Sequence, residues 1–135
     1  MSLIDAFRIG ASATVAQSQR LNAIASNIAN AESTTSASGE AYRAHQVVFR
    51  PTPGYGVAGA GVEVAGVVES SVALRRMYRP GHPNADAAGY VQASNVDPVE
   101  EMVNMVAASR SYQMNIDLMN NSRQLLQRVI DMVRT

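Results

Sequence analysis

Glycine and proline, the residues that break helices, are confined almost entirely to the middle of this 135-residue chain. Eight of the nine glycines and four of the five prolines fall between residues 39 and 89. Each end is therefore nearly free of breakers and can form one long helix, whereas the middle cannot. This distribution predicts a chain that is helical at its two ends and irregular or β-structured between them.

The N-terminal end carries its own helix-start signal. Ser2, followed three residues later by Asp5, makes a capping box, so a helix can begin at once. Apolar and small residues then recur at alternating spacings of three and four, which is the pattern of a coiled-coil stripe. The pattern predicts a helix over residues 1–30, with a seam that includes Phe7, Leu21, Ile24 and Ile28.

The C-terminal end begins with three start signals that agree. Asp97 is a suitable N-cap, Pro98 occupies the first helical position, and Glu100 follows three residues after the cap. These residues predict a C-terminal unit over 96–135, helical from residue 98. Its apolar positions repeat every seven residues and give the expected seam Met102, Met105, Tyr112, Ile116, Met119 and Leu126.

Two long helices, each with one narrow apolar stripe, pair most simply as an antiparallel coiled coil. Residues 31–95 between them hold short β-branched or alternating runs, YRAHQVVFR, GVEVAGVVES and GYVQAS, bounded by turn residues. The expected fold is mainly α with a small β insert, in which a β-hairpin or meander and irregular loops join the paired helices. Narrow stripes bury little apolar area, so such a hairpin alone should be marginally stable.

Three asparagines interrupt the N-terminal helical pattern. Asn22, Asn27 and Asn30 lie on the side of the helical wheel opposite Leu21, Ile24 and Ile28, and no charged residue occurs from 21 to 31. Asparagine disfavours helix interiors, so an uncharged amide face suits close contact with other helices better than contact with water. We expect these amides to meet other chains; a weakly selected polar face is the alternative.

Composition excludes several classes of function. Eleven arginines balance eleven acidic residues, so the chain has no net charge with which to attract nucleic acid or an anionic membrane. Cysteine is absent, which rules out thiolate metal sites and thiol chemistry. The N-terminus lacks the basic and apolar regions of a cleaved secretory signal, and no stretch approaches the roughly 20 apolar residues that span a bilayer. We expect no direct membrane insertion.

Two motifs could suggest an enzyme, but neither has the context it needs. Residues 54–59, GYGVAG, match a dinucleotide-binding pattern, yet no strand precedes them and no helix follows. His82 and Asp86 lie in a loop and His45 in an expected strand. The two histidines have no fixed third ligand for a metal, and no nucleophile with an oriented base is apparent. We expect Asp86 to make a local turn hydrogen bond. We expect no catalytic residue, cofactor or metal.

A basic and aromatic cluster occurs in the sequence LRRMYRP. Arg75, Arg76 and Arg79 surround Tyr78, a combination that can contact RNA or single-stranded DNA. Because the chain has no net charge, a strand end that is solvated or that faces a protein partner is the better interpretation. If the chain is one subunit of an assembly, these arginines are candidates for salt bridges to an adjacent subunit.

Two segments carry a resemblance to a known family. SNIANAES, residues 26–33, and NVDPVEEMVNMVAASRSYQMNIDLMN, residues 95–120, resemble the N- and C-terminal segments of the flagellar basal-body rod and hook proteins. The resemblance implies a structural subunit of the axial rod, exported by the flagellar apparatus without a cleaved signal peptide. It further implies terminal helices that order on assembly, line the central channel, and contact like subunits, other rod proteins and the export apparatus.

Two other classes of function stay open at this stage. A soluble adaptor could present the same coiled coil to a partner as a discrete dimer. A small nucleotide-binding enzyme would depend on residues 54–59 alone. A helical chain that is fully folded and monomeric or dimeric in isolation would favour the adaptor, whereas helicity that rises on polymerisation would favour the rod subunit.

Overall fold

The computed structural model describes residues 3–34, 39–53 and 61–134. The GYGVAG motif at 54–59 lies outside the described residues. In chain order the elements are α1 (Leu3–Ala29), β1 (His45–Thr52), β2 (Gly61–Glu69), β3 (Arg75–Tyr78), β4 (Tyr90–Ala93) and α2 (Pro98–Arg134).

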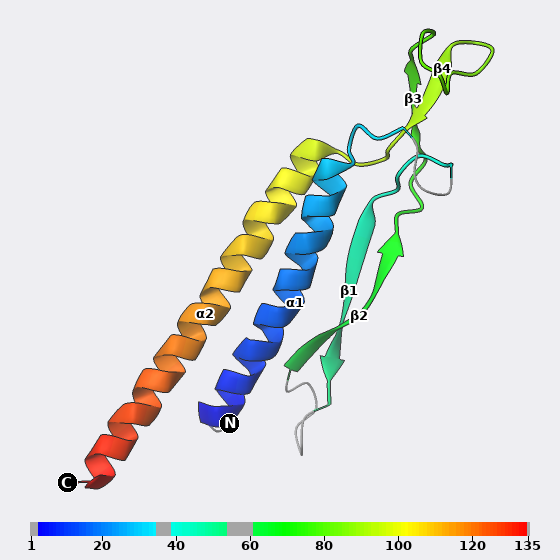
Figure 1. The fold of residues 1–135 in the computed structure, drawn as a ribbon. Coiled ribbons are helices and arrows are strands. Elements are labelled where there is room, and N and C mark those ends of the chain that lie inside the picture. The colour runs from blue at the N-terminus through cyan, green and yellow to red at the C-terminus, as the bar shows by residue number, and fades with distance from the viewer. Residues whose placement is uncertain (1–2, 35–38, 54–60, 135) are drawn as a thin grey trace.

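Two long antiparallel helices dominate the molecule, with the β elements along one side and at one end (Figure 1). The expected fold class, mainly α with paired terminal helices and a small β insert, is confirmed. The insert consists of two separate two-stranded antiparallel sheets, β1–β2 and β3–β4. The β1–β2 ribbon runs beside α1, and the β3–β4 hairpin projects beyond the joined end of the helices (Figure 1).

The start of α2 follows from its cap. The Asp97 carboxylate accepts a hydrogen bond from the Val99 N–H at 2.9 Å, and the Asp97 C=O accepts one from the Glu101 N–H at 3.0 Å. The first bond satisfies an amide that has no partner within the helix, and the second is the first bond of the helix itself. The predicted helix start at Pro98 is therefore confirmed.

The two helices approach closely because small residues lie between them. A Cβ atom built on Gly10 would come within 3.0 Å of Met119 Cγ and 3.5 Å of the Asn115 carbonyl oxygen. Ala108 and Ser122 are almost fully buried on α2. The contact is thus a tight packing of backbone against side chain and not a thick layer of large apolar residues.

The helices differ in length, and α2 extends past α1 at the end where both termini lie (Figure 1). With 27 residues in α1 and 37 in α2, a rise of about 1.5 Å per residue gives helices of roughly 40 and 55 Å. The last turns of α2 therefore have no α1 beside them. Apolar side chains such as Val133, 81% exposed, lie there in the open.

A small core joins the opposite end of the helices to the β elements. Ala31 after α1, Ala44 before β1 and Val96 before α2 are buried together, and Tyr42 packs against them. These three residues lie far apart in the sequence. The cluster therefore fixes the point where both helices and the ribbon meet.

Candidate functional site: the join and the open helix faces

Asn27 lies at the centre of the join between α1, β1 and α2. Its Oδ1 accepts hydrogen bonds from the His45 N–H at 2.8 Å and from the Tyr42 hydroxyl at 2.9 Å. Its Nδ2 donates to the His45 C=O at 2.9 Å and to Glu101 Oε2 at 3.1 Å. The residue is 1% exposed, and every one of these partners is in its own chain.

This placement corrects the expectation that Asn27 meets other chains. The wheel correctly separated the amides from the apolar stripe, but it could not show that the ribbon covers the side of α1 where Asn27 lies. A polar group buried there must form hydrogen bonds, and the Asn27 side chain forms four, to three residues. Asn27 is therefore a structural residue that holds β1 and α2 to α1.

Tyr42 and His45 complete the join. The Tyr42 hydroxyl is 2.6 Å from His45 Nδ1 and 3.2 Å from Ser26 Oγ, and the two rings pack edge to face with centroids 5.0 Å apart. His45 Nε2 lies 3.8 Å from a Glu69 carboxylate oxygen. The histidine thus belongs to a hydrogen-bonded network. The sequence alone indicated only that it lies in a strand.

The other two asparagines lie in different environments. Asn30 closes the end of α1, because its Nδ2 donates to the Ser26 C=O at 2.8 Å and its Oδ1 accepts from the Ser33 hydroxyl at 3.2 Å. Asn22 is exposed, without ribbon or α2 over it. Of the three residues assigned to an intersubunit surface, Asn22 alone presents a fully exposed side chain.

Two of the three arginines assigned to the same surface are used within the chain. Arg75 Nε donates to the Ser94 C=O at 2.9 Å, and Arg75 Nη2 donates to the Ala31 C=O at 3.2 Å, so this side chain fastens the β3–β4 hairpin to the end of α1. Arg76 forms an ion pair with Asp86 at 3.3 Å and lies 4.7 Å from the centre of the Tyr90 ring. Arg79 stays exposed.

Asp86 organises the tip of the β3–β4 hairpin. Its Oδ1 accepts hydrogen bonds from the Ala88 and Tyr90 amides, both at 2.9 Å. The bond from Tyr90 is the main reason that the pKa of Asp86 is lowered below its ordinary value, with Ala88 and the Arg76 charge acting in the same direction. The predicted local turn bond of Asp86 is therefore confirmed.

Most of the predicted seam residues are buried or half-buried, but two are exposed. Ile24 is buried, and the partly covered seam residues are Leu21, Ile28, Met105, Tyr112, Ile116, Met119 and Leu126. Phe7 is 41% exposed and Met102 is 55% exposed. On α2 the most deeply buried positions are instead the small residues Ala108 and Ser122.

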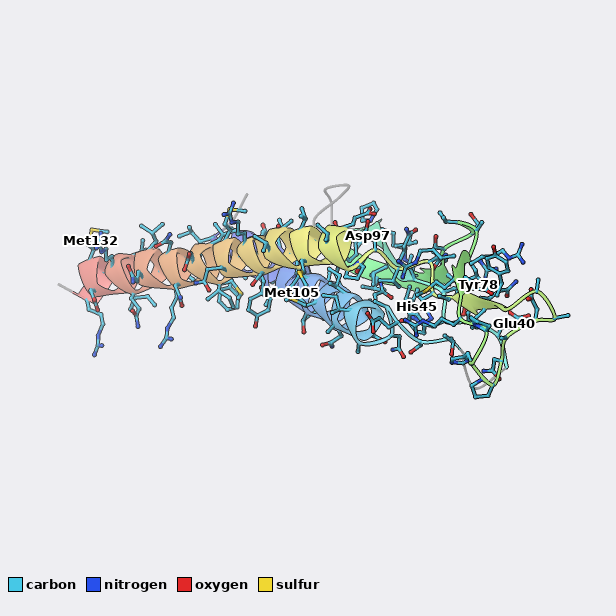
Figure 2. All side chains as sticks on the ribbon, turned by 90° about the horizontal axis from the view of Figure 1, so that it is seen from above. Glu40, His45, Tyr78, Asp97, Met105 and Met132 are labelled. Carbon is cyan, nitrogen blue, oxygen red and sulfur yellow. The ribbon has the colours of Figure 1, made fainter. Side chains whose placement is uncertain are left out.

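The outward face of α2 is apolar near the start of the helix. Val99, Met102, Val103, Val106 and Ala107, with Arg110, line an open groove of about 410 Å³. Val103 is 65% exposed. Exposed apolar groups in a continuous patch mark a surface for contact with another macromolecule. Figure 2 shows the elongated molecule from above, with Met132 toward one end and Tyr78 toward the other.

Side chains that could bind a metal are dispersed in the described part of the chain. No group of three or more His, Cys, Asp or Glu side chains that could hold a metal occurs in residues 3–34, 39–53 and 61–134. Within the same ranges, neither helix combines the length and apolar character needed to cross a membrane. The arrangement defines a class of protein: an elongated structural subunit with two terminal helices, a clamped β ribbon and open apolar helix faces.

Comparison with known proteins narrows this class. Residues 7–37 match the family model "Flagella basal body rod protein", and residues 87–132 match "Flagellar basal body rod FlgEFG protein C-terminal". The chain is 51% identical over 126 residues to the flagellar basal-body rod protein FlgC of Escherichia coli O157:H7 and to that of Salmonella typhimurium. Each match covers 93% of this chain and 94% of the relative. It is 33% identical to FlgC of Bacillus subtilis, in a match that covers 97% of this chain and 98% of the relative.

The chain therefore belongs to the family of the flagellar basal-body rod protein FlgC. The resemblance drawn from residues 26–33 and 95–120 is confirmed by these matches, and the family is structural, not enzymatic.

Proposed function

We propose that this chain is a subunit of the proximal rod of the flagellar basal body and assembles through its helices into the axial tube. In this role the tube transmits torque and encloses the export channel. The neighbours are other rod proteins and like subunits, and the export apparatus delivers the chain without a cleaved signal peptide. The similarity to basal-body rod proteins supports the location in the flagellum, and the open faces of the helices support the mode of assembly.

The outward face of α2 is the observation that carries the proposal. It presents apolar side chains on the side opposite α1, so α2 is apolar on two sides. A helix that is apolar on two sides is stable in water only when a second surface covers it. The uncovered last turns of α2 add to the same argument, because they also expose apolar side chains.

Asn22 is the part of the amide face that remains available for this assembly. It lies on the exposed side of α1, in the uncharged stretch from residue 21 to 31. Uncharged polar side chains allow helices to approach and form hydrogen bonds that fix their register. We assign Asn22, together with the exposed Arg79, to contacts with neighbouring subunits.

Expression of the chain in a flagellated bacterium that lacks its own FlgC tests the proposal. The chain should enter the rod fraction of purified basal bodies and restore swimming. Because the sequence has no cysteine, a single Asn22→Cys substitution allows site-specific cross-linking, and the cross-linked products should contain rod subunits. A chain that stays outside basal bodies as a discrete soluble dimer, measured by light scattering, would instead support the adaptor.

A further inference from the structure

A groove of about 400 Å³ lies between the ribbon and the helices. Its walls come from three elements that are distant in sequence. They contribute Arg20, Ala23 and Ile24 from α1, His45, Gln46, Val47 and Phe49 from β1, and Glu100, Glu101 and Asn104 from α2. The groove is separate from the apolar outward face of α2, and its walls are mainly polar.

The β1 wall is an open strand edge. The N–H and C=O of His45 point away from β2, because both bind the Asn27 amide. Alternate residues of an antiparallel strand present their main-chain groups to the same edge, and the β1–β2 register is regular from His45 to Val48. The N–H and C=O of Val47 therefore point to the same edge, where they have no hydrogen-bond partner within the described part of the chain.

The helix walls offer donors that also lack partners. The side chains of Arg20 and Asn104 are in half-buried residues that line the groove. Neither makes a hydrogen bond or ion pair with any other described residue. Polar groups that are partly removed from water are stabilised when they gain partners, so both walls of the groove favour an occupant rich in hydrogen-bonding groups.

We propose that an extended segment of a neighbouring subunit lies in this groove and adds as a strand to the open edge of β1. An extended chain has hydrogen-bonding groups along both sides. One side can pair with Val47, and carbonyl groups on the other side can accept from Arg20 and Asn104. A helix cannot do this, because its main-chain groups already bond to one another.

Asn27 sets one end of the added strand. Its carboxamide occupies the position beside His45 that a residue of a third strand would take, with one acceptor and one donor in the same order as a peptide group. The added segment therefore begins beside Val47 and runs toward Phe49. The inference rests on the proposed assembly of this chain in the rod, which supplies the neighbour.

A proline substitution tests the open edge selectively. Val47→Pro removes the N–H that the added strand would use but leaves the β1–β2 ladder intact, since proline is tolerated where the N–H of an edge strand faces outward. Val47→Thr keeps the N–H and serves as the matched control. Val48→Pro removes a ladder bond to β2 and shows the effect of damage to the ribbon itself.

The variants are compared by their amount in purified basal bodies and by thermal unfolding of the free chain. We expect Val47→Pro to unfold at the temperature of the unaltered chain yet to enter basal bodies at least about tenfold less, a factor that one lost hydrogen bond can give. Val47→Thr should enter normally. Normal entry of Val47→Pro overturns the added strand and leaves the proposed function intact.

Hydrogen exchange of the unaltered chain gives an independent readout. The Val47 amide should exchange rapidly in the free chain and at least about tenfold more slowly in basal bodies. If Val47→Pro unfolds early, as Val48→Pro should, this measurement decides the matter. An equal exchange rate in both states overturns the added strand, whereas absence of the unaltered chain from basal bodies overturns the proposed function and this inference together.

Discussion

The side-chain amide of Asn27 pairs with both main-chain groups of His45, accepting from its N–H at 2.8 Å and donating to its C=O at 2.9 Å. An asparagine in a helix thus binds the first residue of a strand as a neighbouring strand would. The same amide reaches Glu101 on α2 at 3.1 Å. One side chain on α1 thus binds both β1 and α2.

Replacement of Asn27 by alanine should destabilise the free chain. The substitution leaves the N–H and the C=O of half-buried His45 without their partner, and each such group costs about 1 to 3 kcal/mol. We expect a loss of about 2 to 4 kcal/mol in the free energy of unfolding, measured by denaturant titration with circular dichroism.

Two further variants sharpen this prediction. Asn27→Asp keeps the acceptor but places an oxygen against the His45 C=O and Glu101, so it should destabilise the chain at least as much as Asn27→Ala. Asn22→Ala, at an exposed position of the same helix, should change stability by no more than about 0.5 kcal/mol. Equal stability of the Asn27 and Asn22 alanine variants would show that the join does not depend on the amide.

Gly10 controls how closely the helices approach. A leucine there would collide with Met119 Cγ, which lies 3.0 Å from the position of a Cβ, and overpacking of this kind costs about 1 to 3 kcal/mol. Gly10→Ala should be close to neutral, because the gain of about 1 kcal/mol in helix propensity offsets a contact that the flexible methionine can relieve. Unfolding of both variants by urea measures the difference.

A compensating change identifies the cause. Met119→Ala makes room opposite residue 10, so the double variant Gly10→Leu with Met119→Ala should be more stable than the sum of the two single changes predicts. Purely additive free energies would mean that the two side chains do not meet.

Asp86 should make the hairpin tip sensitive to acid. Its pKa is lowered from 3.8 because the charged carboxylate accepts the Tyr90 and Ala88 amides. A lowered pKa means that the stabilisation is fully present above 3.8 and is lost as the pH falls through the lower value of the folded chain. Exchange of the Tyr90 amide, corrected for its intrinsic pH dependence, should therefore accelerate in that range. Asp86→Asn, which keeps an acceptor oxygen without the charge, should abolish the acceleration.

Local signals in the sequence predicted the helices well. The Asp97 cap and Pro98 act on the residues directly after them, so the start of α2 follows from a few neighbouring side chains. The confinement of glycine and proline to the middle of the chain likewise separates helical ends from the β region. These signals are short in range, and no tertiary contact overrides them here.

The role of Asn27 could not be predicted, because its partners are distant in the sequence. Glu101 is 74 residues away, and His45 is 18 residues away in a strand whose position beside α1 no periodicity specifies. A helical wheel shows which residues share a side of a helix but not what covers that side. The uncharged stretch was a correct sign of contact, and the contact at Asn27 is within the chain.

The α2 seam was predicted in part for a related reason. Met105, Tyr112 and Met119, spaced seven residues apart, form one apolar line along α2. Either of two neighbouring lines of residues with the same spacing can complete the seam with it. The sequence favours the line that includes Met102 and Ile116. In the structure Ile116 is half-buried and Met102 exposed, while Ala108 and Ser122 on the neighbouring line are buried. The close approach at Gly10 decides between them, and that distance is a property of the packed pair and not of either helix alone.

The outward face of α2 should be needed for assembly and not for folding. Val103 and Val106 are exposed in the isolated chain, so the double substitution Val103→Glu with Val106→Glu should leave helicity and thermal unfolding almost unchanged. Burial of two unpaired charges against a neighbour would cost several kcal/mol. We expect entry into purified basal bodies to fall at least about tenfold, because every 1.4 kcal/mol changes an equilibrium constant about tenfold.

The control for this prediction lies on the opposite side of the same helix. Met105 is half-buried toward α1, so Met105→Glu should lower the helicity of the free chain, which the outward pair of substitutions should not do. Circular dichroism of both variants and their amounts in basal bodies separate damage to the fold from loss of a contact surface. If the outward double variant enters basal bodies as well as the unaltered chain, the neighbour of α2 must be sought on another face.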